Sequence, residues 1–347
     1  MLKFEDRFAA WNNLGTHLTR FLSNLDEPQT GWNEELMKVV NTDVHHNGWF
    51  DKSEVLHALG EWAKALSEES LSTWVEKYPR SSFEPTTSKV VGIVMAGNIP
   101  LVGLHDLLTI TLTGHVAKVK MSSDDARLLP ILLKQLGPLN EQIEIVERLK
   151  DIDAVIATGS DNTARYFEHY FGKYPNIIRK NRKSVAVLKG DEDPSTIEEL
   201  GKDIFRYFGL GCRNVSKLYL PADFDLNRIF EAWLPYQEVV QNNKYANNYD
   251  YHRALFLLDR ETFLENGFVV LKEGERMSTP VSVIHYERYS DIDTVVRQLE
   301  EKADSIQCVV GEVSSEKLAV VPFGESQSPK LWDYADGVDT VAFLSTI

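Results

Sequence analysis

The amino-acid sequence predicts an α/β fold in which a helical N-terminal segment precedes a domain with a parallel sheet and a second α/β domain. Apolar runs of strand length alternate with helical patterns over residues 89–188, and this alternation is typical of parallel βαβ units with right-handed crossovers. The chain has 347 residues, enough for two domains of roughly 100–200 residues each. Apolar residues make up 43% of it, which suffices for a packed core.

Residues 1–88 are expected to form helices, because apolar side chains recur there at helical spacing in two stretches. These apolar residues are Phe8, Trp11, Leu14, Leu18 and Phe21 in the first stretch, and Val55, Leu59, Trp62 and Leu66 in the second. The loop between the stretches contains His45 and His46, a pair that suggests a metal site. We identify no partner at ligand spacing, so we expect a solvated loop or local packing, and no metal.

Residues 89–188 are expected to form the parallel sheet. Residues 90–96 are a continuous apolar run, typical of a strand buried on both faces. Gly97-Asn98-Ile99-Pro100 ends this strand, and Pro100 suits the first turn of a helix that reaches about Leu112. Ligands of parallel sheets bind at the carboxyl ends of the strands, where Gly97-Asn98 and Gly159-Ser160 stand. Further strands are expected at residues 116–121, 153–158 and 185–188, and further helices at residues 124–136 and 162–171.

Residues 189–320 are expected to form the second domain, and residues 321–347 a C-terminal arm. A helix begins near Pro194 and ends before Gly209, and residues 215–220 have the pattern of a strand. We expect the arm to return to the first domain or to a partner subunit. Residues 334–343 are interpreted either as a strand arm or as a docked tail, and a homo-oligomer is left open.

Charge and composition argue against several classes of protein. A net charge of −15 argues against nucleic-acid binding, because phosphate contacts need a basic face. The most apolar region, residues 90–119, is interrupted by Gly97-Asn98-Ile99-Pro100 and His105-Asp106, so we expect no membrane span. The first residues lack the apolar core of a signal peptide, and two cysteines are too few for a disulfide framework. We therefore expect a cytoplasmic protein.

The two cysteines stand in different patterns. Cys308 lies within an apolar run that predicts a core strand, where cysteine acts as a small hydrophobe. Cys212 follows a helix and is flanked by Gly209 and Gly211, so we expect an exposed thiol near a bare backbone. Positive charge such as that of Arg213 activates a thiol of this kind. Local sequence alone does not separate an activated thiol from an incidental loop cysteine.

Four segments together resemble the aldehyde dehydrogenase superfamily in their order and rough spacing. Residues 95–100 resemble its Asn-Phe-Pro motif, and residues 118–123 resemble its Lys-Pro-Ser segment. Thr158-Gly159-Ser160 resembles its Thr-Gly-Ser motif, and Gly211-Cys212 falls where its nucleophilic cysteine falls. The resemblance implies a Rossmann-like cofactor domain at residues 89–188 and a catalytic domain at residues 189–320.

Within that superfamily the chain is most similar to the long-chain acyl-CoA reductases, the fatty acid reductase family of bacterial bioluminescence. The residues that carry this similarity are 208–216, 247–251, 323–329 and 333–336. The family implies NAD(P)H-dependent reduction of an acyl-CoA thioester to the aldehyde through an acyl-enzyme on Cys212. It also implies that the Asn98 side-chain amide and the Cys212 backbone N–H stabilise the oxyanion.

The resemblance assigns the cofactor to the strand ends of the first domain. Gly159 and Ser160 would face the pyrophosphate at a helix N-terminus, and Lys120, in the segment with Ser122, would reach the adenosine ribose. Many NAD-preferring members carry a glutamate at the position of Ser123. Serine removes repulsion against a 2′-phosphate, which favours NADPH, although two aspartates follow directly and NADH is left open.

Two departures from the superfamily pattern bear on the reaction. Hydrolytic members carry a glutamate base where this chain has residues 179–184, a basic stretch without a carboxylate. Without a base to activate water the acyl-enzyme is poorly hydrolysed, which fits an acyl-CoA substrate. This stretch either contacts the phosphates of coenzyme A or is a solvated loop. At the place of the later Glu-x-Phe-Gly-Pro motif this chain has Arg276-Met277-Ser278-Thr279-Pro280. Only the proline matches, so no role is assigned to these residues.

Alternatives remain open at this stage. The enzyme could instead reduce an acyl phosphate or an acyl group delivered by a partner synthetase, or the chain could be a non-catalytic subunit with the same fold. His105 is interpreted as a helix histidine with satisfied hydrogen bonds or as a residue near the site. Trp233, Tyr236 and residues 242–251 are interpreted either as an acyl channel or as packing.

Overall fold

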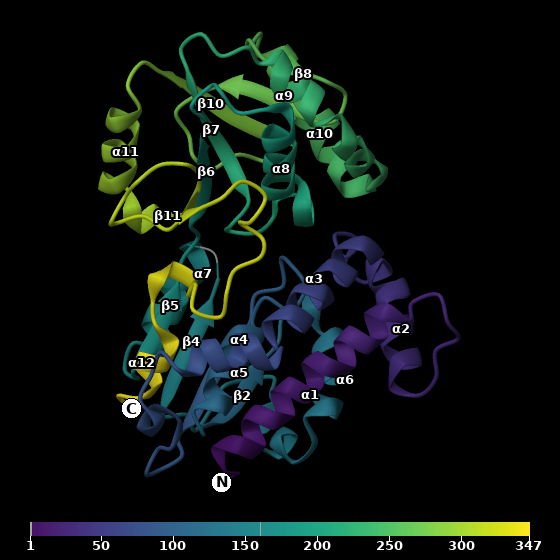
Figure 1. Cartoon of the computed structure of the whole chain (residues 1–347), viewed down its shortest axis with the longest axis vertical. Coiled ribbons are helices and arrows are strands. Elements are labelled where there is room, and N and C mark those ends of the chain that lie inside the picture. Colours follow the sequence, from purple (N-terminus) through teal and green to yellow (C-terminus); the bar gives the residue numbers. More distant parts are fainter. Residues whose placement is uncertain (1, 160) are drawn as a thin grey trace. The chain divides into compact units, whose positions relative to one another are not determined.

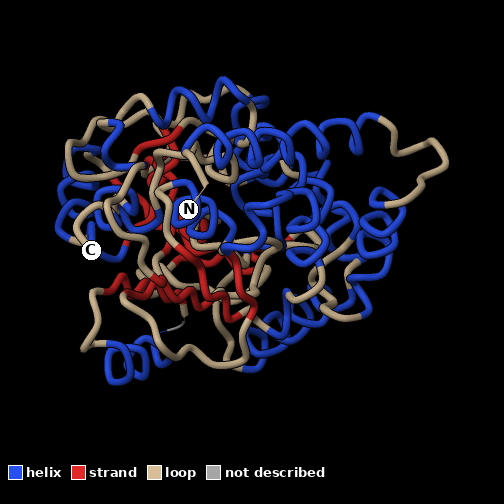
Figure 2. The backbone as a smooth tube through the Cα atoms, turned by 90° about the horizontal axis from the view of Figure 1, so that it is seen from below, coloured by secondary structure: helices blue, strands red, loops and turns tan. Residues whose placement is uncertain are grey.

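The computed structural model describes residues 2–159 and 161–347 (Figure 1). The chain divides into two compact units. The first comprises Met1–Lys180 and Lys330–Ile347, and the second comprises Asn181–Pro329. The chain contains both helices and strands, which Figure 2 distinguishes by colour. No helix in the described part of the chain is long and apolar enough to cross a membrane.

The first unit is built on a five-stranded parallel sheet of order β3-β2-β1-β4-β5. Its strands are β1 (Val90–Val94), β2 (Val116–Lys120), β3 (Ile143–Ile145), β4 (Ala154–Thr158) and β5 (Asn176–Arg179). The connecting helices are α5 (Leu104–Leu112), α6 (Leu128–Leu133) and α7 (Asp161–Phe171). Because β1 has β2 on one side and β4 on the other, the carboxyl end of β1 lies at the switch point where ligands of such sheets bind.

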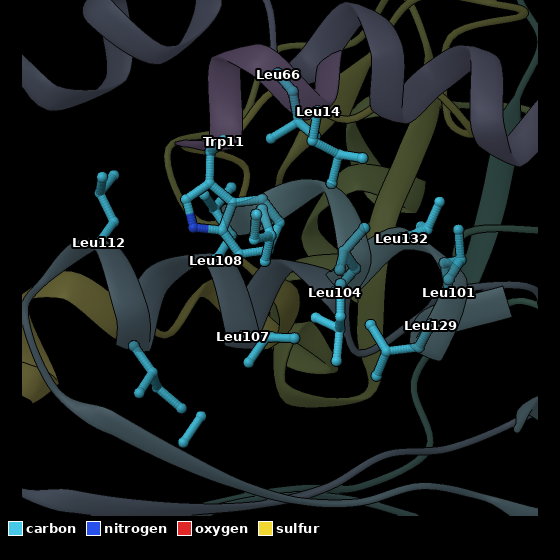
Figure 3. Packing of buried hydrophobic residues seen from close by; sticks show 14 of the residues in the cluster. Trp11, Leu14, Leu66, Leu101, Leu104, Leu107, Leu108, Leu112, Leu129 and Leu132 are labelled. Atoms are coloured by element: carbon cyan, nitrogen blue, oxygen red, sulfur yellow. The ribbon is translucent and has the colours of Figure 1, made fainter. Parts of the chain in front are cut away.

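The N-terminal helices share their core with this sheet. They are α1 (Phe4–Ser23), α2 (Trp32–Thr42), α3 (Lys52–Ala65) and α4 (Glu68–Val75). Trp11 and Leu14 of α1 are fully buried in one apolar cluster with leucines of α5 and α6 (Figure 3). The indole N–H of Trp11 donates to Thr111 Oγ1 of α5 at 3.0 Å. The predicted N-terminal helices are confirmed. Helix α5 packs directly against α1 in their shared core.

The C-terminal residues return to the first unit, as expected. The Trp74 indole donates to the Tyr334 hydroxyl at 2.7 Å, and the His105 ring bonds to Leu331 O at 2.8 Å. The strand-arm interpretation is wrong, because residues 335–337 form a 3₁₀ turn and Thr340–Leu344 forms α12. Asp339 caps α12 by accepting from the N–H of Ala342 at 2.8 Å. The tail therefore docks as a short helix.

The second unit contains a seven-stranded sheet of order β12-β11-β6-β7-β10-β9-β8, in which β8 and β9 are antiparallel. Its strands are β6 (Lys183–Val187), β7 (Val215–Pro221), β8 (Leu264–Glu265), β9 (Val270–Glu273), β10 (Val283–Tyr289), β11 (Ile306–Gly311) and β12 (Val320–Val321). Its helices are α8 (Pro194–Phe205), α9 (Asn227–Ala232), α10 (Asn243–Leu258) and α11 (Ile292–Glu301).

Three expected elements differ from the structure. The helix expected at residues 124–136 is the short α6, with 3₁₀ turns at Ser123–Asp125 and Lys134–Gln142 on either side. The strand expected to close the first sheet is β6, which pairs with β7 and β11 of the second sheet instead. Residues 180–182 alone separate it from β5, and parallel neighbours in one sheet need a crossover of about a dozen residues or more. Helix α5 begins at Leu104 and not at Pro100, because Leu101 has a left-handed φ of 60° that no helix continues.

Candidate active site

The turn that carries Cys212 follows α8 in the second unit. The chain reverses there through Tyr207, Phe208 and Gly209, whose φ angles are 52°, 55° and 77°. Left-handed backbone costs a non-glycine residue about 1–2 kcal/mol, so two such residues in succession need support from their surroundings. The rings of Tyr207 and Phe208 are buried, whereas the Cys212 thiol is exposed. The exposed thiol beyond a helix end agrees with the expectation from the sequence.

Asn214 holds this turn in place, a role that was not predicted from the sequence. Its side chain is 2% exposed, and Nδ2 donates to the carbonyls of Asp203, Ile204 and Arg206 at 3.1, 3.3 and 2.8 Å. These carbonyls lie at the end of α8, where backbone acceptors lack partners within the helix. Oδ1 accepts from Gly211 N at 2.8 Å. The available signal was an asparagine two residues after the cysteine in a glycine-rich turn.

Ser184 of β6 links the two cysteines of the unit. Its hydroxyl donates to Cys212 O at 3.0 Å and lies 3.1 Å from Cys308 Sγ. A hydroxyl has one proton and the carbonyl only accepts, so the Cys308 thiol donates to Ser184. Cys308 is fully buried in β11, and burial raises the pKa of its thiol to about 11. The prediction of a core cysteine at this position is confirmed.

Asp203 ties the C-terminal part of the second unit to the same helix end. Its buried carboxylate accepts from Gly324 N at 2.6 Å and from Ser326 N at 2.9 Å. Burial raises the pKa of Asp203 to about 6, and these amide hydrogen bonds lower it in part. Gly324 and Ser326 lie in residues 323–329, one of the segments that carry the family resemblance. This segment therefore packs on the end of α8, which precedes the Cys212 turn.

A small pocket adjoins the Cys212 turn. Its wall contains Phe205, Phe208, Tyr245 and Ile284, with Asn214 beside them. The cavity volume is about 30 Å³, and about 10–15 Å³ suffices for one water molecule, so the pocket is small in this conformation.

Two of the aromatic residues considered for an acyl channel belong to the core of the second unit. Trp233 is fully buried and donates from Nε1 to Ile197 O at 2.9 Å. Tyr236 stacks on Phe205 with ring centroids 5.2 Å apart. Packing accounts for both residues, whereas Tyr245 lines the pocket.

The strand ends of the first unit bring several predicted cofactor residues together. Asn98 lies in an exposed turn after β1, and Lys120 is the exposed last residue of the neighbouring β2. A Cβ on Gly97 would lie 2.5 Å from Ser122 Oγ, so the turn after β1 packs directly on the segment after β2. Ser123 is exposed, and its carbonyl bonds to the His46 ring at 2.8 Å.

Gly159 follows β4, the other neighbour of β1. A Cβ there would lie 2.9 Å from the Phe167 ring, so this turn accepts only glycine without displacement. Ser160 lies outside the described residues. The ends of these strands present the Lys120 ammonium, the Ser122 hydroxyl and the bare backbone of Gly97 and Gly159. Such hydrogen-bond donors fit the phosphates and riboses of a dinucleotide.

Asp125 holds the turn after β1. Its Oδ2 accepts from Leu101 N at 2.7 Å, three residues beyond Asn98. Burial raises the pKa of Asp125 to about 7, and the hydrogen bond from Leu101 lowers it in part. The contact between Asp125 and Leu101 depends on the fold and has no signal in the local sequence.

The basic stretch after β5 is not a uniformly solvated loop. Arg179 is buried and forms a bidentate ion pair with Asp106 of α5, at 2.5 and 2.8 Å. Arg182 donates to the carbonyls of Ala303 and Ile306. Lys180 is exposed and pairs with Glu168 at 2.9 Å. The hypothesis of coenzyme A contact therefore fails for Arg179.

His105 has the partners expected of a helix histidine. Besides its bond to Leu331 O, its ring packs against Trp74 and Tyr334, with ring centroids 5.6 and 5.5 Å away. These contacts confirm the interpretation of His105 as a helix histidine with satisfied hydrogen bonds.

Comparison with known proteins identifies related sequences. Residues 30–321 match the model of a family described as acyl-CoA reductase (LuxC). A long-chain acyl-protein thioester reductase of Vibrio harveyi is 24% identical over 248 residues, which cover 60% of this chain and 50% of that protein. The corresponding protein of Aliivibrio fischeri is 23% identical over 202 residues, which cover 52% of this chain and 42% of that protein. The chain thus spans about half the length of these curated relatives.

Solved structures share the fold. An NAD-dependent benzaldehyde dehydrogenase of Corynebacterium glutamicum superposes with a TM-score of 0.64 and 13% identity, over 96% of this chain and 83% of that one. The glyceraldehyde-3-phosphate dehydrogenase GapN of Methanocaldococcus jannaschii, complexed with NADP, gives a TM-score of 0.61 and 14% identity over 94% and 82%. The predicted aldehyde dehydrogenase-like α/β fold is confirmed.

Proposed function

The chain belongs to the acyl-CoA reductase (LuxC) family, and we propose that it reduces a fatty acyl thioester to the aldehyde through an acyl-enzyme on Cys212. The observation that carries this proposal is an exposed thiol on a turn whose backbone is fixed on both sides of the cysteine, by Asn214 and by Ser184. A nucleophile needs both access and a fixed position.

The covalent step uses groups of the Cys212 turn. The Cys212 thiolate attacks the thioester carbonyl, and the Cys212 backbone N–H donates to the oxyanion. The tetrahedral intermediate collapses, the new S–C bond remains, and the thiolate of the acyl donor leaves. A nicotinamide cofactor held by the residues at the strand ends of the first unit would supply the hydride that takes the acyl group to the aldehyde level, with Cys212 leaving as the thiolate. On the family resemblance, Asn98 is proposed as a further oxyanion donor.

The proposed cofactor is NADPH, with NADH as the alternative. Lys120, Ser122, Ser123 and Gly159 are the described residues proposed to hold it, with Ser160 added from the resemblance. Ser123 is exposed and has no carboxylate to repel a 2′-phosphate. The two aspartates that follow, Asp124 and Asp125, are the argument for NADH; Asp124 is exposed, and Asp125 is engaged by Leu101 N.

Two acyl donors are consistent with this chemistry. The proposed donor is an acyl-CoA, in line with the description of the family. The second candidate is an acyl group delivered on a synthetase partner, and the curated relatives favour it, because both are named long-chain acyl-protein thioester reductases. Both donors are thioesters, so the same attack by Cys212 serves either.

The test is oxidation of NADPH and NADH by the purified protein with acetyl-, octanoyl- and palmitoyl-CoA. Cys212→Ala is the inactive variant, and Cys308→Ala is the matched control. We expect turnover that disappears with Cys212 and persists without Cys308. Turnover only after addition of an acylated partner would select the second donor. A folded protein that oxidises neither cofactor with any thioester, free or protein-bound, would contradict the proposal and favour a non-catalytic subunit.

A further inference from the structure

We propose that Asn214 is a positioning residue that orients the peptide between Gly211 and Cys212, so that the Cys212 N–H faces the oxyanion of an attacked thioester. This inference rests on the proposed function and assigns a role to a residue outside the motifs that carry the resemblance to the aldehyde dehydrogenase superfamily.

Asn214 binds both backbone polar groups of Gly211. Its Oδ1 accepts from Gly211 N at 2.8 Å, and its own backbone N–H donates to Gly211 O at 3.2 Å. In a trans peptide the C=O and the following N–H point in opposite directions. With Gly211 O directed at Asn214, the Cys212 N–H of the same peptide points away from Asn214. The backbone bond of Asn214 sets the direction of the proposed oxyanion donor, and its side-chain bond holds the preceding peptide, so that the turn keeps this orientation.

The glycine before Cys212 permits this close approach. Gly211 is buried, and a Cβ built on it would lie 2.9 Å from Asn214 Oδ1. A side chain at this position would displace the amide that holds the turn. The pattern Gly211-Cys212 followed by Asn214 thus has a geometric reason in this chain.

Asn214 is itself anchored on the helix end. Its Nδ2 is shared among three carbonyls at the end of α8, and the left-handed pair Tyr207 and Phe208 lies between that helix and the turn. Strained backbone of this kind persists where its surroundings fix it. On the other side of the cysteine, Ser184 holds Cys212 O at 3.0 Å. Hydrogen bonds to the end of α8 and to Ser184 of β6 therefore fix the orientation of the turn.

The chemistry of Cys212 offers a way to separate orientation from general stability. Attack on a thioester passes through an oxyanion, whereas alkylation by iodoacetamide displaces iodide and forms none. Loss of one oxyanion donor lowers the rate of acyl transfer by a factor on the order of 10²–10³. A misoriented Cys212 N–H should therefore slow acylation far more than alkylation.

The experiment compares the two rate constants in the full chain. Acylation is measured as release of coenzyme A from palmitoyl-CoA in a single turnover without cofactor, and alkylation as incorporation of iodoacetamide at Cys212 by mass spectrometry. For Asn214→Ala we expect the ratio of acylation to alkylation to fall by a factor on the order of 10². Asn214→Ser, which keeps a small donor and acceptor, should give an intermediate ratio and covers the case in which the alanine variant does not fold.

Asn266→Ala is the control. Asn266 accepts from backbone N–H groups of Phe268 and Val269 in another turn of the same unit, so its loss perturbs stability without touching the Cys212 turn. We expect its ratio to stay within about twofold of wild type. An unchanged ratio in both Asn214 variants would overturn the positioning role. A wild-type protein whose Cys212 is alkylated but never acylated, by palmitoyl-CoA or by a protein-bound acyl thioester, would instead overturn the proposed function, and this inference with it.

Discussion

Cys212 and Cys308 lie on either side of one serine hydroxyl, yet their surroundings differ in almost every respect. The Cys212 thiol is exposed on a glycine turn between α8 and β7. Cys308 is fully buried in β11, a strand in which every residue is buried. Ser184 contacts the backbone carbonyl of the first and the thiol of the second.

The difference lies in what holds each backbone. The Cys308 region is held by strand pairing and apolar packing, which leave the thiol unreactive. The Cys212 region is held by side-chain amide, hydroxyl and carboxylate groups, from Asn214, Ser184 and Asp203. Buried polar groups that are fully paired fix a backbone in one conformation while leaving the exposed side chain free for chemistry.

The largest difference between the cysteines should appear in activity. Cys212→Ala is expected to lower thioester reduction by a factor on the order of 10³ or more, with an unchanged melting temperature, because the nucleophile is lost. Cys308→Ala should keep the activity and lose about 1 kcal/mol of unfolding free energy, because a small cavity replaces the thiol. Steady-state kinetics and thermal unfolding of both variants check this. Equal inactivation of two well-folded variants would remove the distinction.

The second difference concerns reactivity toward alkylating agents. With the pKa of Cys308 raised to about 11 by burial, only about one molecule in a thousand carries that thiolate at pH 8. We expect iodoacetamide to modify one thiol per folded chain, at Cys212, and both thiols in denaturant. Peptide mapping by mass spectrometry counts the sites. Labelling of Cys308 in the folded protein would show that its strand opens.

The polar support of the Cys212 turn should give stability a dependence on pH. The pKa of Asp203 is raised from 3.8 to about 6, so the folded state binds this proton more tightly than the unfolded state. The resulting stability is fully present below pH 4 and is lost as the pH rises through 6. Between pH 4 and 7 the unfolding free energy of wild type should fall by about 2–3 kcal/mol relative to Asp203→Asn. Parallel stability curves for the two proteins would contradict the assigned shift.

Ser184 tests the link between the two regions. Ser184→Ala removes the hydrogen bond to Cys212 O and the acceptor of the Cys308 thiol, so we expect a loss of about 1–2 kcal/mol. Ser345→Ala is the control, because its hydroxyl bonds to Val341 O on an exposed helix end. Urea unfolding measures both. Equal stabilities of the two variants would show that Ser184 fixes nothing.

Local pattern allowed much of the first unit to be predicted from the sequence. The strands β1, β2 and β4 lie close to the expected residues. In β1 and β4 almost every residue is buried, which gives a continuous apolar run, whereas β2 buries alternate residues. Cys212 was placed correctly beyond a helix, because Gly209 and Gly211 mark the turn.

The rest depends on contacts between distant residues. The buried partner of Arg179 is Asp106, 73 residues earlier in the chain. The residues next to Arg179 do not reveal this ion pair, so the stretch has the sequence pattern of a solvated basic loop. Asn214 acts by reaching back to α8. The error at β6 has a local cause, because the sequence prediction does not include β5 and so does not show the short link that separates the two strands.

The most direct test of the acyl-enzyme is to trap it. The protein is incubated with palmitoyl-CoA without a nicotinamide cofactor, quenched in acid and digested, and the peptides that contain Cys212 and Cys308 are analysed by mass spectrometry. We predict a palmitoyl thioester on the Cys212 peptide, absent in Cys212→Ala and discharged when NADPH is added before the quench. No adduct on Cys212 in a folded protein that turns over the thioester, or an adduct on Cys308 instead, would contradict the covalent mechanism.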